Sequence, residues 1–262
     1  NFTNVQTDSR NVCEKSLFVP LVGEFQDGHK YVAGAIESGA SVVLINNSEY
    51  EKNPSVYDDL CRNKGVLIIC VENTLHGLQD AAEKYVSKFP NLTKISVTGS
   101  SGKTTTKELL VSVFVSKFGD DVVYTKGNFN SETGLPLSVF NIRENHKFGI
   151  FEMGMNHFGE IDYLSKIVKP DIGVITNIGY SHIENLGSRE GILKAKLEIV
   201  NGMDKEGVLV LNGDDSLLYS VKDTVPNKII YYGVKNKESD ICPEKIENMG
   251  DYTTFSVEGK EY

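Results

Sequence analysis

Residues 93–106 read TKISVTGSSGKTTT, and this stretch decides the fold of the 262-residue chain. The apolar and β-branched run 93–98 predicts a buried strand, and residues 104–118 predict a helix. Between them lies a loop of glycine and serine that ends in Gly-Lys-Thr. A strand, such a loop and a helix in this order are the context of a phosphate-binding loop, where backbone N–H groups and the helix N-terminus surround the phosphate.

The loop predicts a nucleotide site in which individual side chains have defined roles. Lys103 would contact the β and γ phosphates of ATP, and the Thr104 hydroxyl would reach Mg²⁺. The residues expected to bind the nucleotide are Gly99, Ser100, Ser101, Gly102, Lys103, Thr104 and Thr105. The alternative is a tight turn with an accidental Gly-Lys-Thr, because the spacing between Gly99 and Gly102 is shorter than in the common pattern. The flanking strand and helix favour the nucleotide site.

Apolar runs alternate with helical patterns along most of the chain, which predicts an α/β protein whose mostly parallel sheet is covered by helices. The expected strands are 41–46, 65–71, 93–98, 147–153, 171–177, 207–211 and 228–232. The expected helices are 31–38, 74–89, 104–118, 159–168 and 188–203. Pro90 interrupts the pattern, so we expect a small N-terminal α/β domain over 1–90 and a P-loop NTPase-like central domain over 91–262. The alternating residues 252–257 predict an edge hairpin in the polar tail.

Composition excludes several classes of protein. Lys and Arg total 27 against 36 Asp and Glu, a net charge of −9 without a basic run, which argues against nucleic-acid binding. The longest apolar runs, such as 66–71, are too short to cross a membrane. The first residues lack a Met and a signal pattern, so we expect a cytoplasmic protein whose start is trimmed. The cysteines match no zinc spacing and predict buried or incidental thiols in a reducing compartment. They are Cys13, Cys61, Cys70 and Cys242.

A carboxylate and an imidazole follow two of the expected strands. Glu152 ends the strand 147–153, and His182 comes just after the strand 171–177. Both would lie at the carboxyl edge of the sheet, where the loop also lies and where ligands bind in parallel sheets. Each alone is more simply a solvated glutamate or an exposed loop histidine, but their shared position favours a site for a divalent cation.

Two other features are less specific. Lys194 and Lys196 lie on the expected helix 188–203, where a lysine is usually a solvated surface residue. Asn128, Asn130 and Glu132 form a dense polar loop that either binds a ligand or supplies turn chemistry. The residue pattern by itself leaves both alternatives open.

Together these stretches resemble the Mur ligases, the ATP-dependent amide ligases of peptidoglycan precursor synthesis. The matching stretches are TDSR at 7–10, GE at 23–24, DGH at 27–29, TGSSGKTT at 98–105, GNFNSETGLP at 127–136, EMGMNHFGEI at 152–161 and TNIGYSH at 176–182. The short spacing of the loop is that of the family. The stretch 127–136 is similar to members that add D-alanyl-D-alanine, with Ser131 in place of the usual Asn. The T-T-P and D-H-L-D stretches of members that add the third peptide residue do not occur.

The resemblance implies a role for particular residues. Lys103, His182 and Lys196 would be catalytic, and Lys196 matches the lysine that the family carbamoylates. The ligands of Mg²⁺ would be Thr104, Glu152, His182 and Lys196. Asn128, Asn212 and Asp214 would join the loop in binding ATP. Ser9 and Arg10 would bind the uridine nucleotide, and the remaining substrate-binding residues would be Asn130, Ser131 and Glu132.

The resemblance also implies an activity. An ATP-dependent ligase would join D-Ala-D-Ala to UDP-MurNAc-tripeptide through an acyl phosphate, acting as a cytoplasmic monomer with no nucleic-acid or membrane partner. The family's third domain would follow Tyr262, so we expect this chain alone to be inactive. The alternatives are a ligase that adds the third peptide residue, a nucleotide-binding module without turnover, and a P-loop NTPase that couples hydrolysis to movement.

Overall fold

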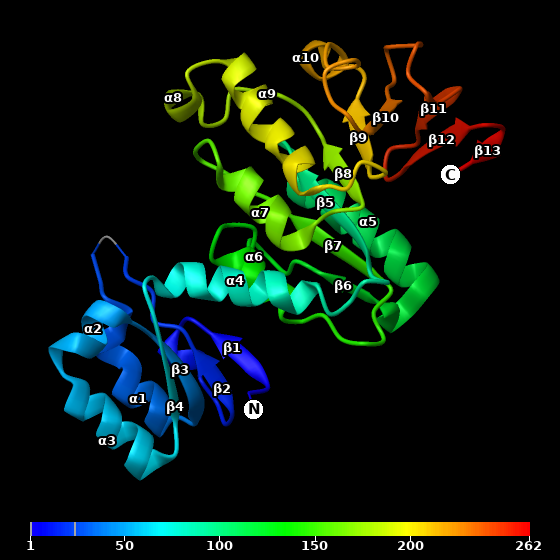
Figure 1. Cartoon of the computed structure of the whole chain (residues 1–262). Coiled ribbons are helices and arrows are strands. Elements are labelled where there is room, and N and C mark those ends of the chain that lie inside the picture. The colour runs from blue at the N-terminus through cyan, green and yellow to red at the C-terminus, as the bar shows by residue number, and fades with distance from the viewer. Residues whose placement is uncertain (1, 24) are drawn as a thin grey trace. The chain divides into compact units, whose positions relative to one another are not determined.

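The computed structural model describes residues 2–23 and 25–262 (Figure 1). Asn1 of the predicted trimmed start and Glu24 of the matching stretch 23–24 lie outside the described residues. The chain divides into two compact units. One consists of Asn1–Lys88 with Pro136–Asn141, and the other of Phe89–Leu135 with Ile142–Tyr262.

The N-terminal unit is a parallel four-stranded sheet with strand order β1-β2-β3-β4. Its strands are β1 (Asn4–Gln6), β2 (Ser16–Phe18), β3 (Ala40–Asn46) and β4 (Leu67–Val71). Its helices are α1 (Val32–Glu37), α2 (Asn47–Lys52), α3 (Pro54–Lys64) and α4 (Thr74–Val86), with short 3-10 turns at Ser9–Asn11 and Gly28–Tyr31. Parallel neighbours such as β3 and β4 need a crossover, and α2 and α3 supply it. Phe18, Val43 and Ile45 are buried in the resulting core.

The second unit contains a six-stranded parallel sheet with strand order β10-β9-β8-β5-β7-β6. Its strands are β5 (Thr93–Thr98), β6 (Val122–Tyr124), β7 (Phe148–Glu152), β8 (Ile172–Ile175), β9 (Val208–Asn212) and β10 (Lys228–Tyr232). Its helices are α5 (Lys103–Phe118), α7 (Glu160–Val168), α8 (Ile183–Leu186), α9 (Arg189–Leu197) and α10 (Ser216–Tyr219), while α6 (Gly134–Val139) leads into the segment that belongs to the first unit. The expected α/β class with parallel sheets is confirmed.

Some expected elements differ from the observed ones. The helix predicted over 31–38 is a 3-10 turn followed by α1, and the one predicted over 188–203 is α9 followed by a 3-10 helix, Glu198–Gly202. Another 3-10 helix, Gly119–Asp121, follows α5. Cys13 and Cys70 are exposed free cysteines, so of the two predicted alternatives, buried or incidental thiols, the first does not apply to them.

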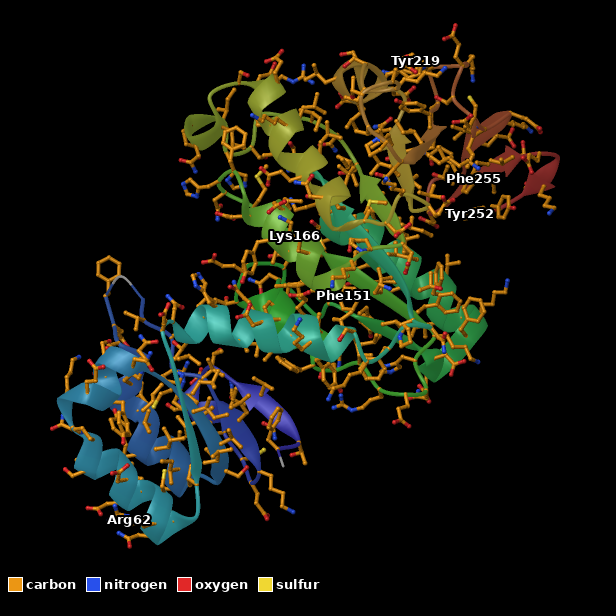
Figure 2. All side chains as sticks on the ribbon, in the orientation of Figure 1. Arg62, Phe151, Lys166, Tyr219, Tyr252 and Phe255 are labelled. Atoms are coloured by element: carbon orange, nitrogen blue, oxygen red, sulfur yellow. The ribbon has the colours of Figure 1, made fainter. Side chains whose placement is uncertain are left out.

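The polar tail forms a sheet of its own. Its antiparallel strands are β11 (Lys245–Asn248), β12 (Thr253–Val257) and β13 (Lys260–Glu261). The hairpin predicted over 252–257 is present, but it belongs to this separate three-stranded sheet, in which β12 pairs with both β11 and β13. Tyr252 and Phe255 of this region are exposed, whereas Phe151 on β7 is fully buried (Figure 2). Among the described residues, no helix combines the length and apolarity that crossing a membrane requires.

Tyr57 on α3 gives the N-terminal unit a defined response to alkaline pH. Burial raises the pKa of Tyr57 to about 12, helped by the Glu49 carboxylate, which accepts the Tyr57 O–H at 3.2 Å. This pKa lies above the ordinary value of 10.0 that applies to the unfolded chain. The stability that the protonated phenol contributes is therefore complete below about pH 10 and is lost as the pH rises toward about 12.

We expect Tyr57→Phe to lower the free energy of unfolding by about 1 kcal/mol at neutral pH, because it removes this hydrogen bond. The difference from the wild type should narrow above about pH 10, because the variant lacks the titrating group. Urea denaturation followed by circular dichroism at neutral and alkaline pH measures both effects. Tyr31→Phe, at an exposed ring, is the control. A difference that stays constant with pH would contradict the assignment.

Candidate active site

The loop between β5 and α5 adopts a shape that two glycines make possible. Gly99 has a φ of +152°, and a Cβ at this position would lie 1.8 Å from Thr176 Oγ1. Gly102 has a φ of +75° and caps the N-terminus of α5. No side chain caps the N-terminus of α5, so its first backbone N–H groups are open toward the loop. An anion site at a helix N-terminus requires such open N–H groups.

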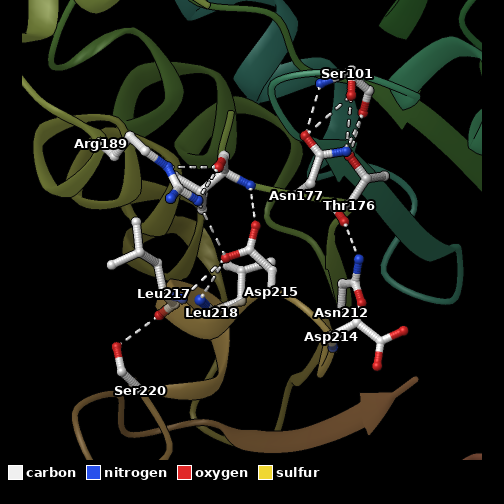
Figure 3. Close-up of polar contacts among 11 residues, drawn as sticks. Ser101, Thr176, Asn177, Arg189, Asn212, Asp214, Asp215, Leu217, Leu218 and Ser220 are labelled. Atoms are coloured by element: carbon white, nitrogen blue, oxygen red, sulfur yellow. Dashed lines mark hydrogen bonds and ion pairs between the residues drawn. The ribbon is translucent and has the colours of Figure 1, made fainter. Parts of the chain in front are cut away.

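The end of β8 binds the loop through two residues (Figure 3). The Asn177 Oδ1 accepts the Ser101 N–H at 3.0 Å, and the Asn177 Nδ2 donates back to the Ser101 carbonyl at 3.0 Å. The Thr176 hydroxyl donates to the same carbonyl at 2.6 Å, and the Ser100 N–H donates to the Asn177 carbonyl at 3.0 Å. Sequence reasoning used Thr176 and Asn177 only as part of a matching stretch and did not predict this role.

Lys103 lies across the loop. Its Nζ donates to the Gly99 carbonyl at 2.9 Å. Burial lowers the pKa of Lys103, and the nearby Glu152 carboxylate acts in the opposite direction. The ammonium thus lies at the mouth of the loop, close to the one buried carboxylate among the described residues of this unit.

Glu152 at the end of β7 is 1% exposed and collects several side chains. Its Oε1 accepts hydrogen bonds from Thr104 Oγ1 at 3.1 Å and from Asn130 Nδ2 at 2.7 Å. Its backbone N–H donates to Thr125 Oγ1 at 3.2 Å. Its second oxygen, Oε2, is buried and has no hydrogen-bond partner among the described residues. A buried carboxylate oxygen without a partner is costly unless something binds it.

This arrangement fits Mg²⁺. Oxygen ligands from one carboxylate and one hydroxyl, completed by phosphate oxygens and water, are what Mg²⁺ takes in nucleotide sites. Over the described residues, no group of three or more His, Cys, Asp or Glu side chains is placed to hold a metal by itself. A cation beside Glu152 and Thr104 would therefore depend on a ligand for the rest of its coordination.

Lys196 on α9 is 1% exposed, while Lys194 on the same helix is exposed. Burial, followed by the charge of the nearby Lys103, lowers the pKa of Lys196 to about 7. The two ammonium groups are thus close enough to repel each other. Near neutral pH a large share of the Lys196 side chain is the uncharged amine, which is a nucleophile.

His182 lies in the segment that follows β8. Its φ of 63° is left-handed, and it precedes the short helix α8. The neighbouring Ser181 hydroxyl donates to the Ser100 carbonyl at 3.2 Å, which brings this segment against the loop. The imidazole itself makes no hydrogen bond or ion pair with the described part of the chain. The structure thus places His182 beside the loop without joining it to Glu152 or Lys196.

The predicted polar loop 127–132 contributes one residue, Asn130, to the cluster around Glu152. Asn130 contacts Glu152, and its carbonyl accepts the Gly154 N–H at 2.8 Å. The Asn128 carbonyl accepts the Asn130 N–H, and the Ser131 hydroxyl accepts the Gly134 N–H at 3.3 Å. Asn128, Ser131 and Glu132 are exposed, so the structure does not bring them into the cluster around Glu152.

Asn212 at the end of β9 and Asp215 just after it bind the backbone that follows β8, whereas Asp214 between them is directed elsewhere. Asn212 Nδ2 donates to the Thr176 carbonyl at 3.1 Å, and Asp215 Oδ2 accepts the Ile178 N–H at 2.7 Å. Asp214 instead accepts three backbone N–H groups, from Val234, Lys235 and Asn236. These bonds lower the pKa of Asp214 and occupy its carboxylate in the turn after β10.

The N-terminal unit has a cavity of about 560 Å³. Its lining residues are Thr7, Asp8, Ser9, Arg10, Leu21, Gln26, Gly28 and Tyr31. Arg10 pairs with Asp8 at 2.6 Å, and the hydrogen bond from its side chain lowers the pKa of Asp8 to about 2. Ser9 and Arg10 therefore line one cavity, with a guanidinium that is exposed to incoming ligands.

Known protein families match both units. Residues 97–262 match the family described as the Mur ligase middle domain, and residues 1–85 match the Mur ligase family, catalytic domain. The chain is 40% identical over 257 residues to the UDP-N-acetylmuramoyl-tripeptide–D-alanyl-D-alanine ligase of Bacillus subtilis, covering 98% of this chain and 52% of that protein. It is 42% identical over 207 residues to the protein of the same name from Treponema pallidum.

Solved structures give the same result. MurF from Acinetobacter baumannii superposes with a TM-score of 0.84 at 30% identity, covering 97% of this chain and 52% of that one. MurF from Thermotoga maritima in complex with ADP gives a TM-score of 0.80 at 29% identity, covering 99% of this chain and 57% of that one. The chain thus spans about half the length of the relatives that it matches. On these grounds the chain belongs to the Mur ligase family.

Proposed function

We propose that this chain supplies the substrate-binding and nucleotide-binding parts of an ATP-dependent ligase that joins D-alanyl-D-alanine to UDP-N-acetylmuramoyl-tripeptide. The observation that carries the proposal is the buried Glu152 oxygen without a partner, beside Thr104 and Lys103 at the mouth of the phosphate loop. Relatives named for this reaction support it. We also propose that it acts in the cytoplasm as a monomer, without nucleic-acid or membrane partners.

The proposed reaction has two steps. The tripeptide carboxylate attacks the γ phosphorus of ATP, so that a carbon-bound oxygen gains the phosphoryl group and ADP leaves. The amine of D-alanyl-D-alanine then attacks the activated carbonyl, and phosphate leaves with formation of the amide. Loop N–H groups and Lys103 offset the negative charge that moves during phosphoryl transfer, while Asn130 orients the Glu152 carboxylate.

Mg²⁺ would be bound by Thr104 and Glu152, and a second ion by His182 and Lys196. When bound, these ions would supply positive charge that polarises the phosphate oxygens. For Lys196 we propose the carbamate form. Its neutral amine nitrogen attacks the carbon of CO₂, the N–C bond forms as one C–O π bond opens, and one proton leaves to solvent, which turns the buried neutral amine into an anionic oxygen ligand.

The cavity around Ser9 and Arg10 is the proposed site of the uridine nucleotide. Arg10 has a planar group of donors that suits a diphosphate, and the cavity volume of about 560 Å³ lies within the range of nucleotide-sized pockets. The other predicted ligand residues stay proposals as well. They are the ATP contacts of Asn128, Asn212 and Asp214 and the substrate contacts of Ser131 and Glu132.

Activity of the complete natural protein that carries this chain tests the assignment. We expect phosphate release from ATP only when both UDP-MurNAc-tripeptide and D-alanyl-D-alanine are present. Release with UDP-MurNAc-dipeptide and a free diamino acid would instead indicate the ligase that adds the third residue. Nucleotide binding without phosphate release would indicate a binding module, and release from ATP alone would indicate an NTPase.

Lys196→Ala should lower kcat by about 100-fold or more, because it removes a proposed metal ligand. Lys194→Ala, two residues away on the exposed side of α9, is the matched control and should stay within about twofold of the wild type. With ¹³C-labelled bicarbonate, a carbamate signal should appear in the NMR spectrum of the wild type and of Lys194→Ala and be absent from Lys196→Ala. A signal that persists in Lys196→Ala would contradict the carbamate proposal.

Arg10→Ala should weaken binding of UDP to this chain by about tenfold or more, since a charge-assisted contact to phosphate is lost. Isothermal titration calorimetry measures the affinity directly. Arg62→Ala is the control, because Arg62 is an exposed arginine on α3 of the same unit and lies outside the cavity (Figure 2). Equal losses in both variants would rule out the cavity as the uridine nucleotide site.

A further inference from the structure

Two charged residues, Arg189 and Asp215 (both labelled in Figure 3), bind the backbone carbonyl and the backbone N–H of Ile178. Arg189 donates to the Ile178 carbonyl from Nη2 at 2.7 Å and from Nε at 3.2 Å. Asp215 Oδ2 accepts the Ile178 N–H at 2.7 Å. Ile178 is 2% exposed, so these backbone groups have little access to water. We call Arg189 and Asp215 the Ile178 clamp.

The clamp joins three separate segments of the second unit. Arg189 is the first residue of α9, Asp215 caps the N-terminus of α10, and Ile178 follows β8. The two charged groups are 4.0 Å apart, and the Asp215 side chain is only 9% exposed. Hydrogen bonds from charged groups are stronger than neutral ones, especially where water is excluded. The backbone at Ile178 is therefore fixed more firmly than an ordinary loop.

The residues on both sides of Ile178 contact the phosphate loop. Immediately before it, Asn177 makes paired hydrogen bonds with Ser101. Shortly after it, the Ser181 hydroxyl donates to the Ser100 carbonyl at 3.2 Å, and His182 follows. A rotation of the backbone at Ile178 would displace both contacts at once. The ring of Tyr180, between them, also lies 5.5 Å from the Arg189 guanidinium.

We propose that Arg189 and Asp215 are positioning residues that set the shape of the phosphate loop and the place of His182. This inference rests on the proposed function, since it concerns the same nucleotide site. Neither side chain needs to touch the nucleotide, because each acts through the backbone of Ile178. The role differs from that of Asp214, whose carboxylate is occupied in the turn after β10.

Arg189→Met removes the donors while keeping an apolar stem of similar length. We expect kcat of the complete protein to fall about 10- to 100-fold with little change in the KM for the UDP-linked peptide, because the loop is displaced but the N-terminal unit is untouched. Binding of ADP to this chain, measured with a fluorescent analogue, should weaken as well. Added guanidinium ion at millimolar concentration should restore part of the lost kcat.

A double-mutant cycle tests whether Arg189 and Asp215 affect kcat as one unit. Asp215→Ser keeps an oxygen for the α10 cap but leaves the Ile178 N–H without its acceptor. If the clamp acts as one unit, Arg189→Met combined with Asp215→Ser should lose little more kcat than the worse single variant. The exposed Lys194→Met on the same helix should leave kcat, KM and the melting temperature unchanged.

Two results would overturn the proposal that the Ile178 clamp positions the phosphate loop. One is a kcat and an ADP affinity of Arg189→Met that both stay within about twofold of the wild type. The other is a double variant whose losses multiply as independent effects. Failure of the proposed function is distinct: the wild type would release no phosphate, while the ADP measurement on this chain would still show whether Arg189 shapes the loop.

Discussion

The close approach of the Gly99 backbone to the Thr176 hydroxyl is the constraint on which the site depends. No side chain fits at position 99, because its Cβ would overlap Thr176 Oγ1. With this contact made, Thr176 and Asn177 reach the carbonyl of Ser101 and fix the loop before any ligand arrives. The loop is thus preorganised from the neighbouring strand, so binding a phosphate requires little ordering of the backbone.

The order of the strands explains how distant residues converge. The phosphate loop follows β5, which lies between β8 and β7 in the sheet. The ends of these two neighbours therefore place Thr176 and Asn177 on one side of the loop and Glu152 on the other. Parallel strands bring their carboxyl ends to one edge, which is why ligands of open α/β sheets gather there.

Most strands of the two parallel sheets were predicted from the sequence, but the three-residue strands β1, β2 and β6 were missed, as were the side chains that support the phosphate loop. Strands 93–98 and 228–232 were predicted with the observed bounds, because each short apolar run lies between turn-forming residues such as Pro, Asn and Gly. Helix α3 was missed, since its composition is mostly polar. Periodicity also does not say that Asp215 rather than Asp214 reaches Ile178, because the turn after β9 decides which adjacent carboxylate points inward. Tertiary structure alone supplies that information.

The balance of charge in the site follows from burial. Burial lowers the pKa of Lys103, which lies near Glu152, and also the pKa of Lys196, which lies near Lys103. The positive charge of Lys103 lowers the pKa of Lys196 further, because the two neighbouring cations repel each other. A polyanion at the loop stabilises the charge of Lys103, because it adds the negative charge that the protein leaves out. In the proposed carbamate form, Lys196 would carry a negative charge, which would suit the proposed metal ions better than a buried ammonium group.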